Sequence, residues 1–455
     1  MTVIDTFETN TFGFNLPCRQ FVIAAERTRE RRLPMVDEFV LRTLHVVQTI
    51  KAARLARFFG FEGQDLGIVI SDLQTRGLVV VDGDNLTLHA SARELFRTSD
   101  GTTPTITVAE PMHADVWFDL VTKHMVSGRG LRNVQHLVSL PAMQAMTESE
   151  ARTAFHDNFR DYLRIARSDK NADQWNLYSI LDVHPGRYSF VQIGGNEVLK
   201  LDPVPKLESR LQLEDYDRGA RTRRLTEAMI VELAKRDEAS PSQVALNDFV
   251  RLVGKEDLGR WMRSDATFDV ADWYSYELRS GADITIPLVG YPYVERNRKA
   301  IAQLLDEVTL DLGKDDRCEL HWLRPGGARW GATEDLPSTL ESLRAIVRAR
   351  TKGGSISTAL VSPAAVGGKE SLLFQRIFDR GLLAPAGKSP IALEILIVPG
   401  ALAVVSVMMP LTQSVHVPIG YVTIDEVAVK RIMHLSRMQA LVNEGERLWP
   451  RSERV

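Results

Sequence analysis

The stretch Leu33–Phe96 constrains the fold of this chain most, because its pattern predicts several helices followed by a hairpin. Apolar residues recur at helical spacing in three successive segments. The run Asp82-Gly83-Asp84-Asn85 is strong turn chemistry between two short β-rich runs. The predicted elements are helices at Met35–Leu44, Ile50–Phe59 and Gln64–Arg76, strands at Leu78–Val81 and Leu86–His89, and a returning helix at Ala92–Phe96.

The sequence LQTRGLVVVDGDNLTLHASARELF in this stretch resembles bacterial winged-helix regulators of the MarR and TrmB type. In those proteins an RGL-like step ends the recognition helix, and the chain returns after the wing into a helix. The resemblance implies a winged helix at residues 34–98 and a DNA-binding role. A transcription regulator would look like this, and so would the DNA-engaging subunit of a bacterial DNA-processing or antiviral (phage) defence complex.

The predicted recognition helix is poorly suited to reading bases. Its expected exposed residues include Asp65 and Asp72, which phosphates would repel, and only Arg76 is basic. Winged helices also serve as protein-docking and dimerisation modules. We therefore expect either double-stranded DNA, held through its backbone, or a protein partner, and we expect a homo-oligomer.

One neighbourhood of the chain is clearly basic. From Arg19 to Arg57 there are nine Lys/Arg and four Asp/Glu, a local net charge of 9 − 4 = +5. The whole chain has a formal net charge of −3, so any nucleic-acid contact must come from such a local patch. These side chains either contact phosphates or form a solvated face with internal Glu–Arg pairs. The candidate DNA-binding residues are Arg27, Arg29, Arg31, Arg32, Lys51, Arg54, Arg57 and Arg76.

The rest of the chain predicts an α+β multidomain protein with a mixed α/β middle region and a C-terminal α/β layered domain. Thr147 to Glu150 form a capping box that opens a helix to about Arg167. Three strands are expected near Tyr178–Val183, Tyr188–Ile193 and Glu197–Leu201. The predicted division is an N-terminal arm at 1–33, a winged helix at 34–98, a middle domain at 99–275 and a C-terminal domain at 276–455.

In the C-terminal domain, strands alternate with helices in a way that indicates a partly parallel sheet. The expected strands are Asp283–Val289, Cys318–Leu323, Ser355–Val361, Ile391–Val398, Ala401–Met409 and Val415–Val422. The expected helices are Val294–Val308, Ser338–Arg350, Lys369–Arg380 and a last long helix capped by Asp425 and ending near Trp449. The apolar hairpin, strand and long helix ending EGERLWPR resemble the phospholipase-D-like domain of some bacterial winged-helix regulators.

That resemblance does not extend to a working active site. A phospholipase-D-type site needs His-x-Lys-x4-Asp, with the histidine as nucleophile and the lysine on the phosphate. None of the ten histidines has a lysine two residues on. His416 lies in about the right strand, but Pro418 and Thr423 occupy the lysine and aspartate positions. A domain of this ancestry would be degenerate and catalytically inactive.

The alternative is a nuclease or phosphodiesterase whose site is assembled from distant residues. The candidates are Asp182 with Glu197 and Lys200, or His416 with Asp425. Metal-dependent nucleases of this kind need Glu-x-Lys, and Lys200 is three residues after Glu197, so it would point to the opposite face of a strand. Histidines occur singly, so we expect no metal site and no cofactor.

Two further features bear on the cellular compartment. The chain has two cysteines, Cys18 and Cys318, and its first residues lack the basic and apolar run of a signal peptide, so we expect a cytoplasmic protein. Ile391–Leu411 is long and apolar enough for a membrane span. It contains Glu394 and a central Pro399-Gly400, which favour two buried strands joined by a tight turn and no membrane contact.

Overall fold

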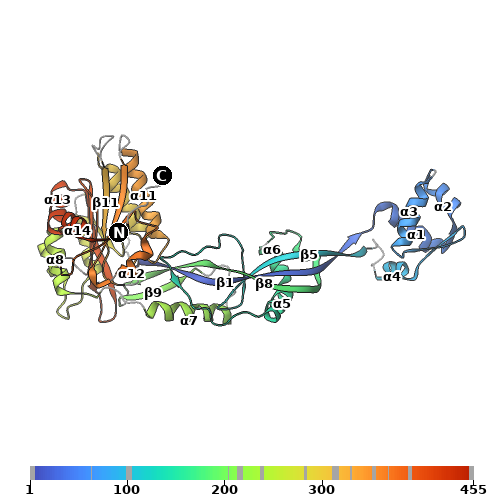
Figure 1. Ribbon diagram of the computed structural model, residues 1–455, viewed down its shortest axis with the longest axis horizontal. Coiled ribbons are helices and arrows are strands. Elements are labelled where there is room, and N and C mark those ends of the chain that lie inside the picture. Colours follow the sequence, from blue (N-terminus) through green and yellow to red (C-terminus); the bar gives the residue numbers. More distant parts are fainter. Residues whose placement is uncertain are drawn as a thin grey trace.

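Three sheets divide the computed structural model into parts that follow one another along an elongated molecule (Figure 1). We call them the head (the eight-stranded sheet and its helices), the stalk (the six-stranded sheet) and the distal module (residues 35–98, with the three-stranded sheet). The structure describes residues 6–62, 64–98, 105–165, 167–202, 204–212, 219–235, 240–280, 284–309, 317–327, 330–350, 355–366, 368–387 and 392–449.

The distal module contains every helix and strand predicted for it, with bounds shifted by one to three residues, and it has one further short strand. Gln48 adopts a positive φ and ends the first helix, and Ile50 then joins a short strand opposite Leu86 instead of starting the second helix. Tertiary pairing of a β-branched residue here overrides the helical pattern. The elements are α1 Met35–Val47, β2 Thr49–Lys51, α2 Ala52–Phe59, α3 Asp65–Thr75, β3 Val79–Asp82, β4 Asn85–Leu88 and α4 Ala90–Thr98.

The stalk is organised by β1 (Thr6–Arg32), a single strand of 27 residues where the sequence predicted an arm. At ~3.3 Å per residue this strand is ~90 Å long. It pairs antiparallel with β8 (Trp175–Lys200) along almost its whole length, and from Cys18 to Arg32 also with β5 (Thr105–Asp119). Residues 1–5 of the predicted arm lie outside the described residues.

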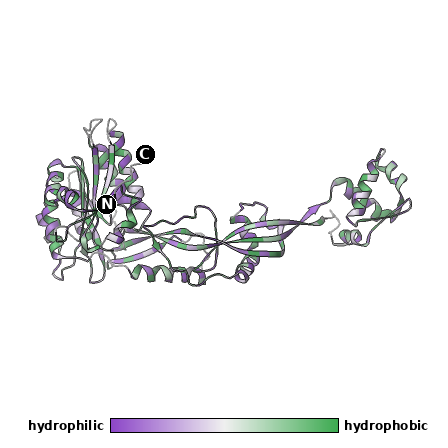
Figure 2. Cartoon of the chain, in the orientation of Figure 1, coloured by the Kyte–Doolittle hydropathy of each residue, from purple (hydrophilic) through white to green (hydrophobic). Residues whose placement is uncertain are grey.

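The buried face of β1 changes half-way along the strand. Phe12, Phe14 and Leu16 pack in a cluster with Leu225 and Met229 of α7 (Ala220–Ala234). Beyond them the buried residues are Phe21, Ile23 and Ala25, which pack with α5 (Glu148–Asp157) and α6 (Phe159–Ile165). The first set has even numbers and the second has odd numbers, and such positions of a strand point to opposite faces. Helix α7 therefore covers one face of β1 in its first half, and α5 and α6 cover the other face in its second half. Figure 2 shows hydrophobic and hydrophilic residues interspersed along these strands.

β8 replaces the three short strands that were predicted between Tyr178 and Leu201. Its 26 residues include Pro185-Gly186 and Gly194-Gly195, residues that usually end a strand. The register between β1 and β8 shifts near Pro185, and this irregularity accommodates the proline without ending the strand. At Gly195 a Cβ atom would overlap the Phe12 ring, so the glycine allows the aromatic ring of β1 to lie on the strand.

The expected helix from Thr147 also divides, because α5 ends at Asp157 and α6 begins at Phe159. The capping box itself is confirmed: Thr147 accepts from the Glu150 backbone amide, and the Glu150 carboxylate accepts from the Thr147 amide. The remaining stalk strands are β6 Met125–Val126, β7 Val138–Ser139 and β9 Lys206–Leu211.

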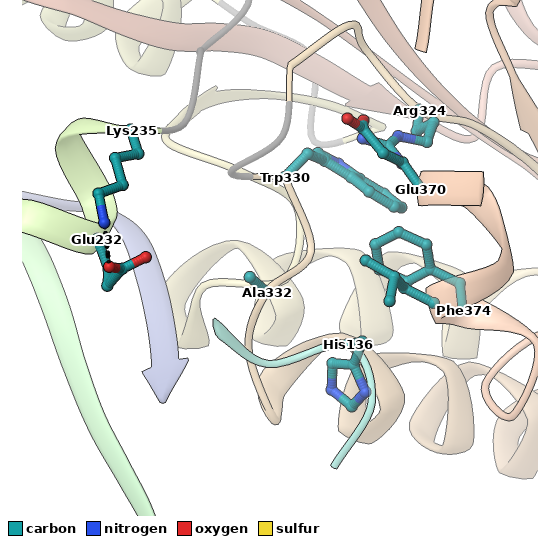
Figure 3. A pocket seen from close by; sticks show the side chains of 9 residues that line it. His136, Glu232, Lys235, Arg324, Trp330, Ala332, Glu370 and Phe374 are labelled. Carbon is teal, nitrogen blue, oxygen red and sulfur yellow. Dashed lines mark hydrogen bonds and ion pairs between the residues drawn. The ribbon is translucent and has the colours of Figure 1, made fainter. Parts of the chain in front are cut away.

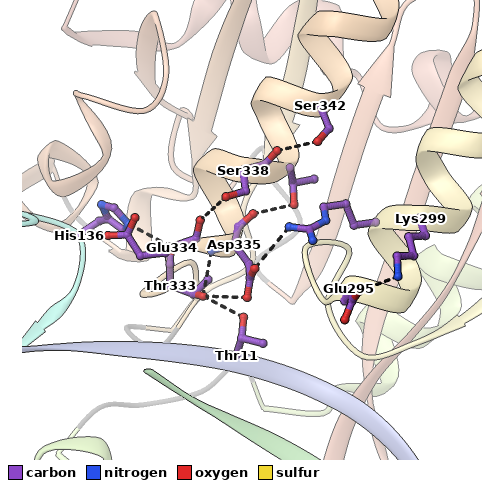
Figure 4. Close-up of polar contacts among 11 residues, drawn as sticks. Thr11, His136, Glu295, Lys299, Thr333, Glu334, Asp335, Ser338 and Ser342 are labelled. Atoms are coloured by element: carbon purple, nitrogen blue, oxygen red, sulfur yellow. Dashed lines mark hydrogen bonds and ion pairs between the residues drawn. The ribbon is translucent and has the colours of Figure 1, made fainter. Parts of the chain in front are cut away.

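The first residues of β1 are bound directly to the head. The Tyr291 amide donates to Thr9 O at 2.9 Å, and the Gly13 amide donates to Ala332 O at 2.7 Å. Thr11 and Thr333 share a hydrogen bond of 2.9 Å between their hydroxyls (Figure 4). The stalk and the head are therefore joined by both backbone and side-chain hydrogen bonds.

The head has strand order β10-β16-β15-β14-β11-β12-β13-β17, with β11, β12 and β13 parallel and the other pairs antiparallel. This confirms the expected mixture of α and β with a partly parallel sheet. The strands are β10 Thr285–Val289, β11 Arg317–Leu323, β12 Ser355–Ser362, β13 Arg380–Leu383, β14 Leu393–Val398, β15 Leu402–Pro410, β16 His416–Thr423 and β17 Glu446–Trp449. The predicted strand residues Asp283 and Ile391 lie outside the described part of the chain.

Helices cover both faces of this sheet. Alternate residues of β14 and β15 belong to two separate apolar clusters, one including Ile395 and Val405, the other including Leu396 and Val404. A strand buried on both faces reads as a continuous apolar run, which explains the stretch that has the length of a membrane span. β14 and β15 form the predicted hairpin, with Gly400 at positive φ in its turn.

The helices of the head are α8 Gln243–Val253, α9 Val270–Ser280, α10 Glu295–Glu307, α11 Asp335–Arg350, α12 Gly368–Ser371, α13 Glu426–Leu435 and α14 Met438–Glu444. Residues of α8 and α9, which the predicted division assigns to the middle domain, pack in the core of the head. Across the residues that the structure describes, no helix has the length and apolar character needed to cross a membrane.

Two predicted helices of the head are wrong. The expected helix Lys369–Arg380 ends at Ser371, continues as a 3-10 turn at Leu372–Phe374, and gives way to β13. The expected last helix is divided by Arg437, which has φ 55°, and it ends before β17. β17 pairs with β13 and lays the Trp449 ring over Gly381, where a Cβ would overlap the ring. This long-range pairing overrides the local helical pattern. The predicted cap at Asp425 is confirmed.

Glu394 on β14 is a buried acid that holds the centre of the head together. Its Oε1 accepts from the indole nitrogens of Trp322 at 2.9 Å and Trp330 at 2.7 Å, and its Oε2 accepts from the Ser406 hydroxyl at 3.3 Å. Burial raises the pKa of the Glu394 carboxyl to about 7, because desolvation outweighs these hydrogen bonds.

A raised carboxyl pKa makes the folded state bind a proton that the unfolded state has lost. The contribution of Glu394 to the free energy of unfolding is therefore greatest below the unfolded pKa and falls as pH rises to about 7. We predict that the free energy of unfolding of the wild type falls by about 2–3 kcal/mol between pH 5 and pH 8, beyond any change seen in Glu394→Gln over the same range. Urea unfolding of the two proteins at both pH values measures the difference. If the free energy of unfolding had the same pH dependence in both proteins, the raised pKa of Glu394 would be contradicted.

Candidate nucleic-acid interface

Arg27 and Arg29, two of the candidate DNA-binding residues, are bound within the stalk. Both form ion pairs with Glu110 of β5, at 3.3 Å and 3.0 Å. Both guanidinium groups also lie over the Trp175 ring, with their central carbons 3.6 Å and 4.5 Å from its centre. The Glu110 carboxylate offsets part of their combined positive charge and both guanidinium groups lie over the ring, so the two arginines are held as part of the sheet.

Other charges of the basic neighbourhood are likewise engaged. The Arg19 guanidinium lies 4.9 Å from the centre of the Tyr188 ring, and Arg42 pairs with Glu38 at 2.8 Å. Arg76 forms ion pairs with Asp37 and, at 2.9 Å, with Asp72. Arg76 thereby links the end of α3 to α1 through an ion pair, so its role is structural.

The remaining candidates are free of such pairs. Lys51, Arg54 and Arg57 are exposed at the start and along the outer side of α2, and Arg31 and Arg32 are exposed at the end of β1. Among the described residues the structure shows no ion pair for any of these five. Since exposed, unpaired Lys and Arg side chains are what phosphate contacts require, these five residues form the candidate interface.

The acidic residues around this interface reduce its positive electrostatic potential. Residues 33–98 contain seven Lys/Arg and eight Asp/Glu, a net charge of 7 − 8 = −1. Asp65 and Asp72 are exposed on α3, as expected from the sequence. Any electrostatic attraction to a nucleic acid would therefore come from the side of the module that carries the unpaired basic residues, and the exposed acids make α3 unfavourable for contact with phosphates.

A second surface of the distal module is apolar. Met35, Phe39 and Val46 of α1 have relative exposures of 74%, 53% and 79%. Their spacing of four and then seven residues places them on one face of the helix. Exposed apolar side chains grouped on one face mark an interaction surface. We call these three residues the α1 stripe.

The structure does not bring the alternative catalytic residues together. Asp182 and Glu197 lie on one strand, fifteen residues and therefore ~50 Å apart. Asp182 pairs with His184 at 2.7 Å, and Lys200 pairs with Glu208 at 2.7 Å.

His416 begins β16, and Asp425 follows the end of that strand, ~30 Å away. Within the described ranges, no group of three or more His, Cys, Asp or Glu residues could hold a metal ion. Neither predicted catalytic set forms a site.

The structural likenesses to known proteins include two weak ones. The first is a phospholipase D family member, Nuc from Salmonella typhimurium, with 11% identity, a TM-score of 0.21, and 36% of this chain and 99% of that chain covered. The second is TrmBL2, an archaeal chromatin protein whose structure shows a novel mode of DNA binding, with 9% identity, a TM-score of 0.23, and 55% and 76% covered. Both TM-scores are too low to support a fold or a function for this chain. No family model and no curated protein sequence matches it.

Sequence analysis missed the neutralising partners of the basic neighbourhood. Glu110 and Trp175 lie far along the chain from Arg27 and Arg29, so a local charge count could not include them. The available signal was the alternation of buried apolar residues in residues 12–25, which is typical of a strand and not of a free arm.

The Arg27–Glu110–Arg29 cluster yields a stability prediction. Glu110→Gln leaves two arginines together over Trp175 without a carboxylate, so the free energy of unfolding should fall by about 1 kcal/mol at low salt. The difference should shrink as NaCl screens the repulsion. Thermal unfolding in low and high NaCl measures it, with Glu62→Gln, an exposed acid of the distal module, as the control. An equal loss at both salt concentrations would indicate a packing role instead.

Proposed function

We propose that this chain is a non-catalytic protein that binds the DNA backbone through a winged helix held at the end of its stalk. The single observation that carries the proposal is the group of exposed, unpaired basic residues Lys51, Arg54 and Arg57 on the distal module, with Arg31 and Arg32 close by in sequence where β1 ends. The order of three helices and a β-hairpin in residues 35–98 supports a winged-helix assignment.

Binding of this kind is independent of DNA sequence. Lys and Arg contacts to phosphate fix position and affinity, whereas base readout needs polar or basic side chains on the helix that enters the groove. The exposed acids Asp65 and Asp72 on α3 argue against base readout. Such a protein would act as a regulator or as the DNA-engaging subunit of a larger assembly, with the degenerate α/β head as its attachment point.

We predict that affinity for duplex DNA falls steeply with salt and that Lys51→Ala/Arg54→Ala/Arg57→Ala lowers the steepness. Loss of three phosphate contacts should reduce the slope of log K against log salt by about 2–3. A gel-shift titration over a series of NaCl concentrations measures the slope. Arg27→Met/Arg29→Met is the matched control, because those arginines are paired within the stalk and should leave the slope unchanged.

The control also decides between two accounts of the basic neighbourhood. If the stalk variant lowers the slope as much as the α2 variant, the interface extends along β1 and the assignment to α2 is wrong. If the wild type shows no binding at low salt, the DNA-binding proposal is rejected, and the distal module is left as a protein-docking element.

We further propose that the protein is a homo-oligomer joined through the α1 stripe. Three large apolar side chains exposed on one helix face favour association with a matching apolar face. Phe39→Glu should therefore shift the protein toward the monomer without unfolding it, because Phe39 is half-exposed. Light scattering coupled to size exclusion measures the mass. Val427→Glu, an exposed apolar position on α13 of the head, is the control; a wild-type monomer at all concentrations would refute this proposal.

A further inference from the structure

A cavity of about 360 Å³ lies between the head and α7, and it contains a buried arginine. Arg324 follows directly after β11 and has a relative exposure of 1%. The aromatic side chains Trp330, Phe374 and His136 line the cavity on the side of the head. On the opposite side it is lined by Glu232 and Lys235, which pair with one another at 2.5 Å (Figure 3).

Arg324 has donors that the protein does not use. Its Nη2 donates to Gly327 O at 2.7 Å, but within the described residues Nε and Nη1 have no hydrogen-bond partner. An unsatisfied buried donor costs roughly 1–3 kcal/mol, and a charged one costs more. Native proteins leave few such groups, and each one calls for a physical explanation such as a ligand.

The aromatic rings hold the guanidinium group in the cavity. The central carbon of Arg324 lies 5.3 Å from the centre of the Trp330 ring and 5.2 Å from that of Phe374. Trp330 is itself fixed by its hydrogen bond to Glu394. Burial lowers the pKa of Arg324 to about 10, so the side chain stays charged at neutral pH.

A second unused polar atom lies on the neighbouring strand. Ser362 ends β12 and is fully buried, and its hydroxyl has no hydrogen-bond partner within the described residues. β11 and β12 run parallel with Leu323 opposite Val361, so Arg324 and Ser362 occupy the next matched position on the same face. In open α/β sheets, ligands bind at the carboxyl ends of parallel strands, and this is where both residues lie.

We propose that this cavity binds a small organic anion, whose phosphate or carboxylate oxygens accept from Arg324 Nε and Nη1 and whose flat apolar part lies against Trp330 and Phe374. A volume of about 360 Å³ suits a molecule of metabolite size. The proposal does not depend on whether the distal module binds DNA.

The other charged groups around the cavity allow an anion to enter. Burial lowers the pKa of His136 to about 4, so this side chain is neutral at pH 7 and Arg324 supplies the attraction to an anion on this side of the cavity. Glu370 is exposed, and its carboxylate lies beside the Arg324 guanidinium in Figure 3. An incoming anion displaces Glu370 toward solvent, so Glu370 weakens binding and selects against weakly held anions.

Calorimetric titration of the full chain with inorganic phosphate, phenyl phosphate and benzoate at constant ionic strength tests the proposal. We expect saturable binding of phenyl phosphate about tenfold tighter than that of inorganic phosphate, because only the former contacts the rings. A response to benzoate alone would identify the natural group as a carboxylate. Absence of saturable binding of all three compounds would overturn the proposal.

Arg324→Met should abolish this binding and raise the melting temperature of the unliganded protein, because it removes a buried charge with unsatisfied donors. Arg350→Met is the control, since Arg350 lies in the head but pairs with Asp306 at the surface. Unchanged binding in Arg324→Met would overturn the assignment.

Glu370→Gln keeps the test decisive if Arg324→Met fails to fold. Removing the competing carboxylate should tighten phenyl phosphate binding several-fold. If Glu370→Gln instead lowers the melting temperature and leaves the affinity unchanged or weaker, Glu370 is a structural counter-charge of Arg324, and the cavity is not an anion site.

Discussion

The pairing of β1 with β8 is the interaction on which the rest of the molecule depends. It runs from Thr6 opposite Lys200 to Arg29 opposite Trp175, and it joins the parts that carry the two candidate sites. At one end β1 is hydrogen-bonded to the head through Thr9 and Gly13. At the other end, only Leu33 and Pro34 separate it from α1 of the distal module. The pairing of β1 with β8, joined by β5 from Cys18 onward, thus fixes the distance between head and module.

A ladder of this length needs side-chain burial along its whole extent, because an isolated two-stranded ribbon is only marginally stable in water. The stalk meets this need with two separate apolar clusters on opposite faces, one around Phe14 and one around Phe21. Where these clusters end, Arg27 and Arg29 stack on Trp175 and pair with Glu110. The basic residues there are therefore part of what holds the strands together, and the unpaired basic residues begin only beyond them, at Arg31.

The sequence was sufficient to predict elements whose causes are local. Helical spacing located α1 and α3, the Thr147 capping box and the Asp425 cap located two helix starts, and Pro399-Gly400 located a hairpin. The elements that were missed depend on distant partners. β17 exists because it pairs with β13, although its residues fall within the expected last helix.

The same distinction applies to the candidate sites. A local charge count identified Lys51, Arg54 and Arg57 together with arginines that are neutralised by Glu110, because the count cannot include partners from another strand. Arg324 belongs to no motif, and only the folded head brings it over Trp330 and Phe374 at the end of β11. A site assembled from strand ends has no signature in a single sequence.

The long sequence separation between β1 and β8 has a consequence for biosynthesis. β8 is translated more than 140 residues after β1 is complete, and the contacts of β1 at Tyr291 and Ala332 follow later still. Until then the edge of β1 that β8 will cover has unpaired backbone groups next to apolar side chains such as Phe14 and Phe21, and exposed edges of this kind aggregate readily. The nascent chain must therefore keep β1 separate from other chains, by a chaperone or by early formation of its native pairing with β5, which covers one edge from Cys18 to Arg32. Such a requirement would make slow translation between β5 and β8 harmful to the yield of folded protein.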